Sequence, residues 1–485
     1  MGTSRRDIFK GATGLALAAA AAPLASSPGH AAEQGQELAA RSGAPGQRYV
    51  LKGGTIISMD ARVGNIEKGD ILIEGKKILE VGGDIVANVQ AIDATNMIVI
   101  PGFVDAHRHA WEGQLRRINP NAPTLASYSA ATHQGFAPHY RPYDMYAGNY
   151  ISAIGCIDAG ITCMIDNSHN SRSSEHSDEA IRALLDSGIR AVHGSGAPQQ
   201  GEWDRQWPRD LERIKGRFFS SDDQLVTLRM VSGINAENWT FARRLGLSIS
   251  TEFRGANAPQ LEPLWSQNLI GPHNTFNHCG LVPDATWRRM KAAGVTVNVC
   301  PRSDTQYGLE EGFPAFQAAL DHAMKPAFSV DNETSYSTDM FTEMRVAFHI
   351  QRGLAQNRKS KGDANAPRPI STREVLECAT VNGALNAGLS DKIGSIVPGK
   401  EADLVMIRSD DLNLYPSNNA IGTVVSGADR GNIDTVIIGG KIRKFRGQMI
   451  GVDMARFKTI ADGSRLYLFG KAGYKPDIFA AEFKI

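Results

Sequence analysis

Five polar side chains stand at or just beyond the ends of short apolar runs with the composition of buried β-strands. They are His107, His109, Glu252, His278 and Asp331. His107 and His109 are two residues apart, so in an extended segment both imidazoles project to the same side. Imidazole and carboxylate groups bind divalent transition metals, zinc above all and also iron or manganese. The spacing therefore predicts a site for one divalent metal ion, with zinc expected.

The elements that carry these side chains alternate between β-like runs and helical stretches from about residue 97 to residue 394. Eight β-like runs are present, at residues 97–104, 161–165, 190–193, 226–231, 247–253, 275–278, 295–299 and 326–330. This alternation predicts an α/β fold with a (β/α)₈ TIM barrel, whose active site lies at the carboxyl ends of the strands. An open doubly wound sheet is disfavoured, because no Gly-rich phosphate loop follows the first run.

The two ends of the chain are also rich in strands. Short β-rich runs separated by turn residues occur between residues 49 and 81, and again at 402–407 and 434–441. We therefore expect a composite β-sandwich domain formed from residues 48–100 and 393–450, with the metal-dependent barrel, residues 101–392, inserted in it. Residues 451–485 are expected to form a C-terminal extension.

Composition restricts the class of partner. The 485 residues are 42% hydrophobic and carry a formal net charge of +1, so no broad basic field favours nucleic acid or an anionic membrane. A small-molecule substrate fits better. The five cysteines are widely spaced, without a C-x-x-C pair, and are expected to be buried thiols. Nothing in the sequence decides whether the chain forms a homo-oligomer.

The N-terminus reads S-R-R-D-I-F-K at residues 4–10, followed by an Ala-rich apolar run and small residues near position 32. This pattern resembles a twin-arginine signal peptide over residues 1–32. The apolar run, residues 11–22, is shorter than the roughly 20 residues that span a bilayer, so a stable membrane anchor is not expected. The expectation is export by the twin-arginine machinery to the periplasm or the medium.

Residues 101–109 read P-G-F-V-D-A-H-R-H and resemble the P-G-x-x-D-x-H-x-H motif of the amidohydrolase superfamily. Four further segments are similar to the cytosine deaminase and s-triazine hydrolase branch of that superfamily: residues 278–279, 331–341, 379–384 and 393–404. The resemblance spans about residues 48–450. It implies a hydrolase of C–N bonds, an amidohydrolase or heterocycle deaminase, with a heterocyclic or amide-like substrate.

The resemblance also implies roles for single residues. His107, His109 and Asp331 would hold one metal ion, and Asp331 would also lie near the water that the metal activates. His278 would polarise the substrate or stabilise charge that develops on it. Asp331, His278 and Glu252 are thus the candidate catalytic residues.

The fifth strand departs from the superfamily pattern H-x-x-E, in which the histidine is a ligand and the glutamate a proton shuttle. Here Glu252 occupies the ligand position and Gly255 the shuttle position. Glu252 could be a fourth metal ligand, it could be the proton carrier beside a three-ligand site, or the hydrolytic machinery could have decayed. The sequence leaves these three alternatives open.

Four further side chains are candidates for contact with the substrate, because they flank the metal motif or follow strands 2 and 7: Trp111, His169, Arg302 and Gln306. Two alternative functions remain at this point. One is a catalytically reduced barrel that binds a small ligand, and the other is hydrolysis with a leaving group other than nitrogen.

Overall fold

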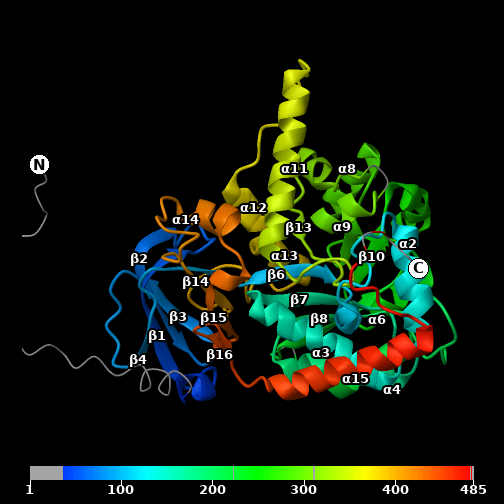
Figure 1. The fold of residues 1–485 in the computed structure, drawn as a ribbon. Coiled ribbons are helices and arrows are strands. Elements are labelled where there is room, and N and C mark those ends of the chain that lie inside the picture. The colour runs from blue at the N-terminus through cyan, green and yellow to red at the C-terminus, as the bar shows by residue number, and fades with distance from the viewer. Residues whose placement is uncertain (1–36, 222, 310–311, 481, 483–485) are drawn as a thin grey trace, which may run out of the picture.

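The computed structural model describes residues 37–221, 223–309, 312–480 and 482. The expected signal peptide, residues 1–32, lies outside the described residues. The chain forms an eight-stranded parallel barrel beside a separate sheet domain (Figure 1). Among the described residues, no helix is both long and apolar enough to cross a membrane.

The barrel strands follow one another around the barrel in chain order. They are β6 (Phe103–Arg108), β7 (Ile161–Ser168), β8 (Arg190–Ser195), β9 (Val226–Val231), β10 (Ile249–Phe253), β11 (Asn274–His278), β12 (Thr296–Val299) and β13 (Ala327–Phe328). A parallel bridge between Arg108 and Asp331 joins the last strand to the first and nearly closes the barrel. The expected TIM-barrel fold is confirmed.

The first predicted strand was wrong in extent. Residues 97–104 do not form one strand, because Gly102 separates β5 (Met97–Pro101), which belongs to the sheet domain, from β6 in the barrel. A Cβ at Gly102 would lie 2.0 Å from the hydroxyl oxygen of Thr162 on β7, so only glycine fits there. His107 consequently lies inside β6, and His109 directly follows that strand.

The sheet domain is built from both ends of the chain, as expected, and its nine strands form one continuous hydrogen-bonded sheet. Its strands are β1 (Arg48–Ile57), β2 (Asn65–Glu74), β3 (Lys77–Gly82), β4 (Gln90–Asp93), β5, β14 (Leu404–Arg408), β15 (Ile433–Ile438), β16 (Lys441–Phe445) and β17 (Gln448–Met449). The predicted run 434–441 is in fact a hairpin that turns at Gly439 and Gly440, both of which have positive φ.

Strand β14 joins the two domains through the alternation of its side chains. Leu404 and Met406 pack in the core of the sheet domain, whereas Val405 and Ile407 pack in the large core that surrounds the barrel. The barrel is therefore fixed to the sheet domain by continuous apolar packing.

The helices pack around the barrel, over the cavity and against the sheet domain. They are α2 (Leu125–Ser129), α3 (Pro142–Asp158), α4 (Ser174–Ser187), α5 (Asp210–Phe218), α6 (Ala236–Arg244), α7 (Glu262–Ser266), α8 (Asp284–Ala293), α9 (Pro301–Gln306), α10 (Phe316–Asp321), α11 (Met340–Ser360), α12 (Thr372–Ala379), α13 (Val381–Ala387) and α14 (Ala420–Gly422), with α15 (Met454–Ala472) in the C-terminal extension. In Figure 1, α11 projects from one side of the molecule, and α15 runs along the barrel beside α3.

Candidate metal centre

Five side chains converge at the carboxyl ends of four barrel strands, as the sequence predicts. His107 lies in β6 and His109 just after it, Glu252 lies in β10, His278 ends β11, and Asp331 follows β13. The backbone closes the barrel at the same place, because the Asp331 N–H donates to the His107 carbonyl at 3.0 Å and the His109 N–H donates to the Asp331 carbonyl at 2.7 Å.

His107, His109, Glu252 and Asp331 form what we call the metal centre. The Asp331 Oδ1 atom lies 3.2 Å from His107 Nε2 and 3.3 Å from His109 Nε2, and Glu252 Oε1 lies 3.5 Å from His107 Nε2. His107 Nε2 is buried and has no hydrogen-bond partner. Two imidazoles and two carboxylates, with one buried nitrogen left without a hydrogen-bond partner, make a donor set of the kind that zinc takes in catalytic sites.

The charges at the centre hold one another ionised. Burial alone would raise the pKa of Asp331, but the adjacent His107 and His109 imidazoles hold that pKa well below its ordinary value. Burial alone would lower the pKa of His109, but Asp331 raises it to about 9. Asp331 thus favours the protonated form of the His109 ring, and a bound cation would compete with that proton.

Two asparagine side-chain amides hold His107 and Glu252 in place. Asn167 Nδ2 lies 2.8 Å from His107 Nδ1 and 3.1 Å from Glu252 Oε1, and Asn277 Nδ2 lies 3.1 Å and 3.2 Å from the same two atoms. The amides thus hold one oxygen of Glu252 beside the His107 ring. Sequence reasoning did not single out either asparagine, although Asn277 is the in-register partner of Glu252 on the neighbouring strand.

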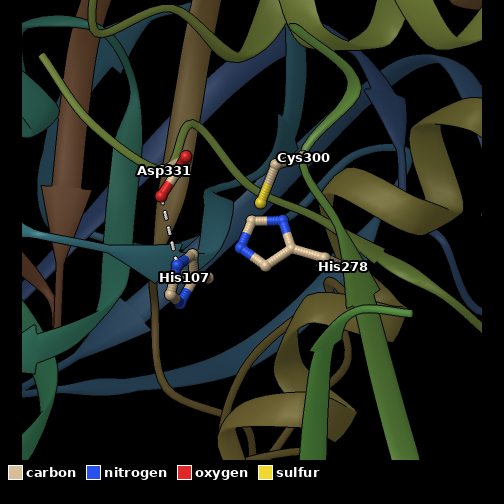
Figure 2. Close-up of side chains that lie close together, drawn as sticks. All are labelled: His107, His278, Cys300 and Asp331. Atoms are coloured by element: carbon tan, nitrogen blue, oxygen red, sulfur yellow. Dashed lines mark ion pairs between the residues drawn. The ribbon is translucent and has the colours of Figure 1, made fainter. Parts of the chain in front are cut away.

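His278 connects the centre to a second carboxylate. Its Nε2 atom lies 3.0 Å from Glu252 Oε2, and its Nδ1 atom lies 2.7 Å from Asp304 Oδ1. Figure 2 shows the ring beside His107, with the Asp331 carboxylate and the Cys300 sulfur nearby. Glu252 therefore lies between His107 and His278, where it can act on either one.

Gly255 cannot carry the shuttle of the superfamily pattern. A Cβ at this position would lie 1.9 Å from the Leu281 carbonyl oxygen, which leaves no room for any side chain. Glu252 is consequently the carboxylate that β10 brings to the metal centre, and a glutamate at position 255 would clash rather than restore a shuttle.

The centre lies at the inner end of a cavity of about 510 Å³. Its wall combines apolar, aromatic and polar side chains, contributed by His109, Leu125, Ala126, Tyr128, Ser129, His133, Gln199, Glu252, Phe253, Arg254, Asn257, His278, Ser303, Leu309 and Asp331. A pocket of this volume with a few convergent polar groups is typical of small-molecule sites.

The four residues predicted to contact a substrate lie outside this cavity wall. Trp111 is fully buried and packs against His169, whose Nε2 atom lies 2.9 Å from His109 Nδ1. Arg302 pairs with Glu343 at 2.6 Å, and Gln306 donates to the Ala122 carbonyl at 3.1 Å. The structure gives all four residues protein contacts, and their contact with a substrate stays a prediction.

Sequence reasoning missed the wall segment formed by α2 and the adjoining π-helical turn η2 (Ala130–Phe136). Tyr128 and His133 come from this segment, and Tyr128 donates to Glu112 Oε1 at 2.6 Å. Burial raises the pKa of Glu112 to about 8, and its second oxygen has no hydrogen-bond partner. The segment has no strand or helix periodicity long enough to be detected, so only the run of polar and aromatic residues could have drawn attention to it.

Residues 257–443 match the model of the amidohydrolase family. The 5-methylthioadenosine/S-adenosylhomocysteine deaminase of Pyrococcus abyssi is 25% identical over 433 residues, which cover 83% of this chain and 95% of that protein. The 5'-deoxyadenosine deaminase of Methanobrevibacter smithii is 26% identical over 400 residues, which cover 77% and 88%.

Two solved structures share the fold. The adenosine deaminase of Xanthomonas campestris, with bound zinc, aligns with a TM-score of 0.74 at 20% identity and covers 88% of this chain and 99% of its own. The atrazine chlorohydrolase of Arthrobacter aurescens, complexed with zinc, aligns with a TM-score of 0.70 at 20% identity and covers 86% and 100%. The likeness extends over both the barrel and the sheet domain.

Proposed function

We propose that this chain belongs to the amidohydrolase superfamily and is a zinc-dependent hydrolase. Its reaction would remove an amino group from a heterocyclic substrate. One observation carries the proposal: His107, His109, Glu252 and Asp331 meet around the buried, unpartnered His107 Nε2 atom at the inner end of the cavity.

The residues of the metal centre would hold the ion, and a bound zinc ion would acidify a water molecule for attack on an electron-poor ring carbon. Asp331 Oδ1 lies 3.2 Å and 3.3 Å from the Nε2 atoms of the two imidazoles, and its Oδ2 accepts a hydrogen bond from Ser303, which keeps the carboxylate oriented. Ser303 and Asp331 both line the cavity, so a substrate meets these groups directly.

Glu252 would transfer the proton, and His278 would stabilise charge on the substrate. Their side chains are 3.0 Å apart, and both line the cavity. Asp304 at 2.7 Å holds the His278 ring by Nδ1, which leaves Nε2 directed at Glu252. We propose that Glu252 passes a proton toward the leaving nitrogen while His278 stabilises the charge that develops on the ring. This arrangement supplies the shuttle that Gly255 cannot.

The substrate class is proposed from the relatives and the cavity together. Both curated relatives named above are deaminases of adenosine derivatives. A cavity of about 510 Å³ suits a ligand of nucleoside size, and Leu125, Leu309 and Tyr128 provide apolar surface for a flat ring. We therefore propose a purine nucleoside or a similar amino-substituted heterocycle.

The test is ammonia release from a panel of adenosine derivatives, aminopyrimidines and amino-s-triazines by the zinc-loaded protein. Turnover of at least one member with stoichiometric ammonia is expected. A second candidate reaction, displacement of halide, is favoured by the structural likeness to atrazine chlorohydrolase. Chloro-s-triazines therefore belong in the panel, with chloride release as the readout. Tight binding of a panel member without release of either product would instead favour a reduced, ligand-binding barrel.

We further propose that the twin-arginine machinery exports the folded enzyme to the periplasm, on the basis of residues 4–10. The paired substitution Arg5→Lys with Arg6→Lys should leave the precursor in the cytoplasm. Fractionation followed by immunoblotting measures this, and an unchanged periplasmic yield would contradict export by this route.

A further inference from the structure

Cys300 places a thiol beside the metal centre. It follows β12 directly and is fully buried. Its sulfur points toward the His278 ring in Figure 2. The ligand atoms of His107, His278, Cys300 and Asp331 all lie within 4.8 Å of one another, and so do those of His107, His109 and Glu252. The two groups share His107 and differ in their other members.

We propose that the centre offers a cation two overlapping positions, and that in the second the Cys300 thiolate is a metal ligand together with His107, His278 and Asp331. This inference shares the centre with the proposed hydrolase but does not depend on which substrate is turned over. It assigns to Cys300 a role that goes beyond the two-histidine and carboxylate set.

The chemistry of binding at the second position is a proton exchange. The cation forms a bond to sulfur as the S–H bond breaks, and the thiol proton leaves to solvent. A bound metal deprotonates a coordinating thiol outright.

The surroundings of Cys300 suit a thiolate once it forms. Ser329 Oγ lies 2.9 Å from the sulfur and can donate a hydrogen bond to it. His278 adds a second imidazole, and His107, which both groups contain, has a buried Nε2 atom without a hydrogen-bond partner. Two imidazoles, a carboxylate and a thiolate make a four-ligand set of the kind that zinc takes.

A thiolate ligand changes the order of metal preference. Sulfur favours soft and borderline cations such as cadmium, cobalt and zinc, whereas carboxylate and imidazole alone suit manganese as well. Cys300→Ser should therefore weaken cadmium binding at least about tenfold, the lower end of what even supporting residues control. Manganese binding should change much less.

The deciding experiment is the absorption spectrum of the cobalt-loaded protein, with Cys279→Ser as the matched control. Cys279 is also buried and neighbours His278, but its sulfur donates to the Phe276 carbonyl at 3.5 Å and belongs to neither ligand group. Wild type and Cys279→Ser should show a near-ultraviolet sulfur-to-cobalt charge-transfer band. Cys300→Ser should keep cobalt in the first position and lose the band.

Two results would overturn the proposal: wild-type protein that holds cobalt without the band, or a band that persists in Cys300→Ser. Thermal unfolding checks that the variant is folded. X-ray absorption at the zinc edge of the wild-type protein tests the same point without any variant, since a sulfur ligand lies at about 2.3 Å. Zinc content and ammonia release are recorded in parallel. They report on the proposed hydrolase independently, so failure of the sulfur signal leaves that function standing.

Discussion

Two clusters of buried charged side chains lie at opposite ends of the barrel strands. At the amino ends, Arg190 of β8 pairs with Asp403 at 2.8 Å and with Glu401 at 2.6 Å, and the Gly439 N–H also donates to Asp403 at 2.7 Å. We call Arg190, Glu401 and Asp403 the scaffold cluster. At the carboxyl ends lies the metal centre, where His107 Nε2 has no hydrogen-bond partner and Asp331 adopts a left-handed backbone with φ of 70°.

The scaffold cluster contributes to stability, whereas the metal centre is arranged for chemistry at a cost in stability. In the scaffold cluster, the Arg190 guanidinium meets two carboxylates in hydrogen-bonding geometry, and the cluster joins the barrel to the sheet domain. The metal centre instead keeps an unsatisfied nitrogen and a strained backbone beside a cavity, both of which cost stability. Functional sites are where such local violations are retained.

The strongest way to break this comparison is to remove two ligands of the metal centre. His107→Ala with His109→Ala should abolish metal binding, which is about one zinc per chain in the wild type, and reduce turnover to background. Enzymatic accelerations of about 10⁶-fold or more rest on such machinery. Metal analysis and ammonia release measure the effect, and His349→Ala on the exposed part of α11 is the control. Stoichiometric metal in the double variant would refute the site.

Glu252→Gln sharpens the assignment within the centre, because the amide keeps the size of the side chain but cannot carry a proton as a carboxylate does. We expect weaker metal binding that excess zinc restores, since one ligand oxygen remains. At saturating zinc, turnover should stay about 10²–10⁴-fold below wild type, the usual contribution of a general acid–base residue.

The control for this prediction is Glu262→Gln, which changes an exposed glutamate on α7. Full turnover at saturating zinc would mean that Glu252 is a metal ligand and does not carry a proton. Wild-type metal content together with wild-type turnover would remove both roles and contradict our account of the strand-5 end.

Arg190→Met tests the other side of the comparison. Removing the cation leaves Glu401 and Asp403 buried without their guanidinium partner, and loss of one member of a buried pair costs about 3–5 kcal/mol of unfolding free energy. Turnover per folded molecule should not change. Denaturant unfolding measures the loss, and Arg62→Met, which removes an exposed pair with Asp60, should cost less than about 1 kcal/mol. Impaired turnover in folded Arg190→Met would show that the two clusters are coupled.

The sequence predicted the barrel and the convergence of the five site residues because strand periodicity and strand ends are local signals. His107 lies near the end of β6 and His109 just after it. Glu252 is the next-to-last residue of β10, His278 ends β11, and Asp331 follows β13. All five cysteines are buried, as expected, but burial alone did not reveal that Cys300 faces His278.

Other features depend on contacts between distant segments and have no local signal. The break at Gly102 depends on Thr162, and the crowding at Gly255 depends on Leu281. The wall residues Tyr128 and His133 lie on short irregular turns whose position is set by packing. Strand ends could therefore be predicted, whereas the shape of the cavity around them could not.

The smallest expected effect is a change in melting temperature at Glu112. This residue is a buried carboxyl group with no basic partner among its hydrogen bonds. It accepts one from Tyr128, and burial raises its pKa to about 8. A carboxyl group whose pKa rises on folding keeps its proton in the folded state after the unfolded chain has released it. Stability therefore falls as the pH rises from about 4.5 to about 8.

Glu112→Gln removes this ionisation while keeping the acceptor for Tyr128. In the metal-free protein, the variant should match the wild-type melting temperature at pH 5 and exceed it by about 1–3 °C at pH 9. With zinc bound, the gain at pH 9 should shrink, because a cation at the neighbouring centre stabilises the ionised Glu112 of the wild type. Scanning fluorimetry at the two pH values measures both effects. Equal melting temperatures at pH 9 without metal would contradict this account. They would mean that a group other than Tyr128 compensates the negative charge of Glu112, as Arg190 does for the carboxylates of the scaffold cluster.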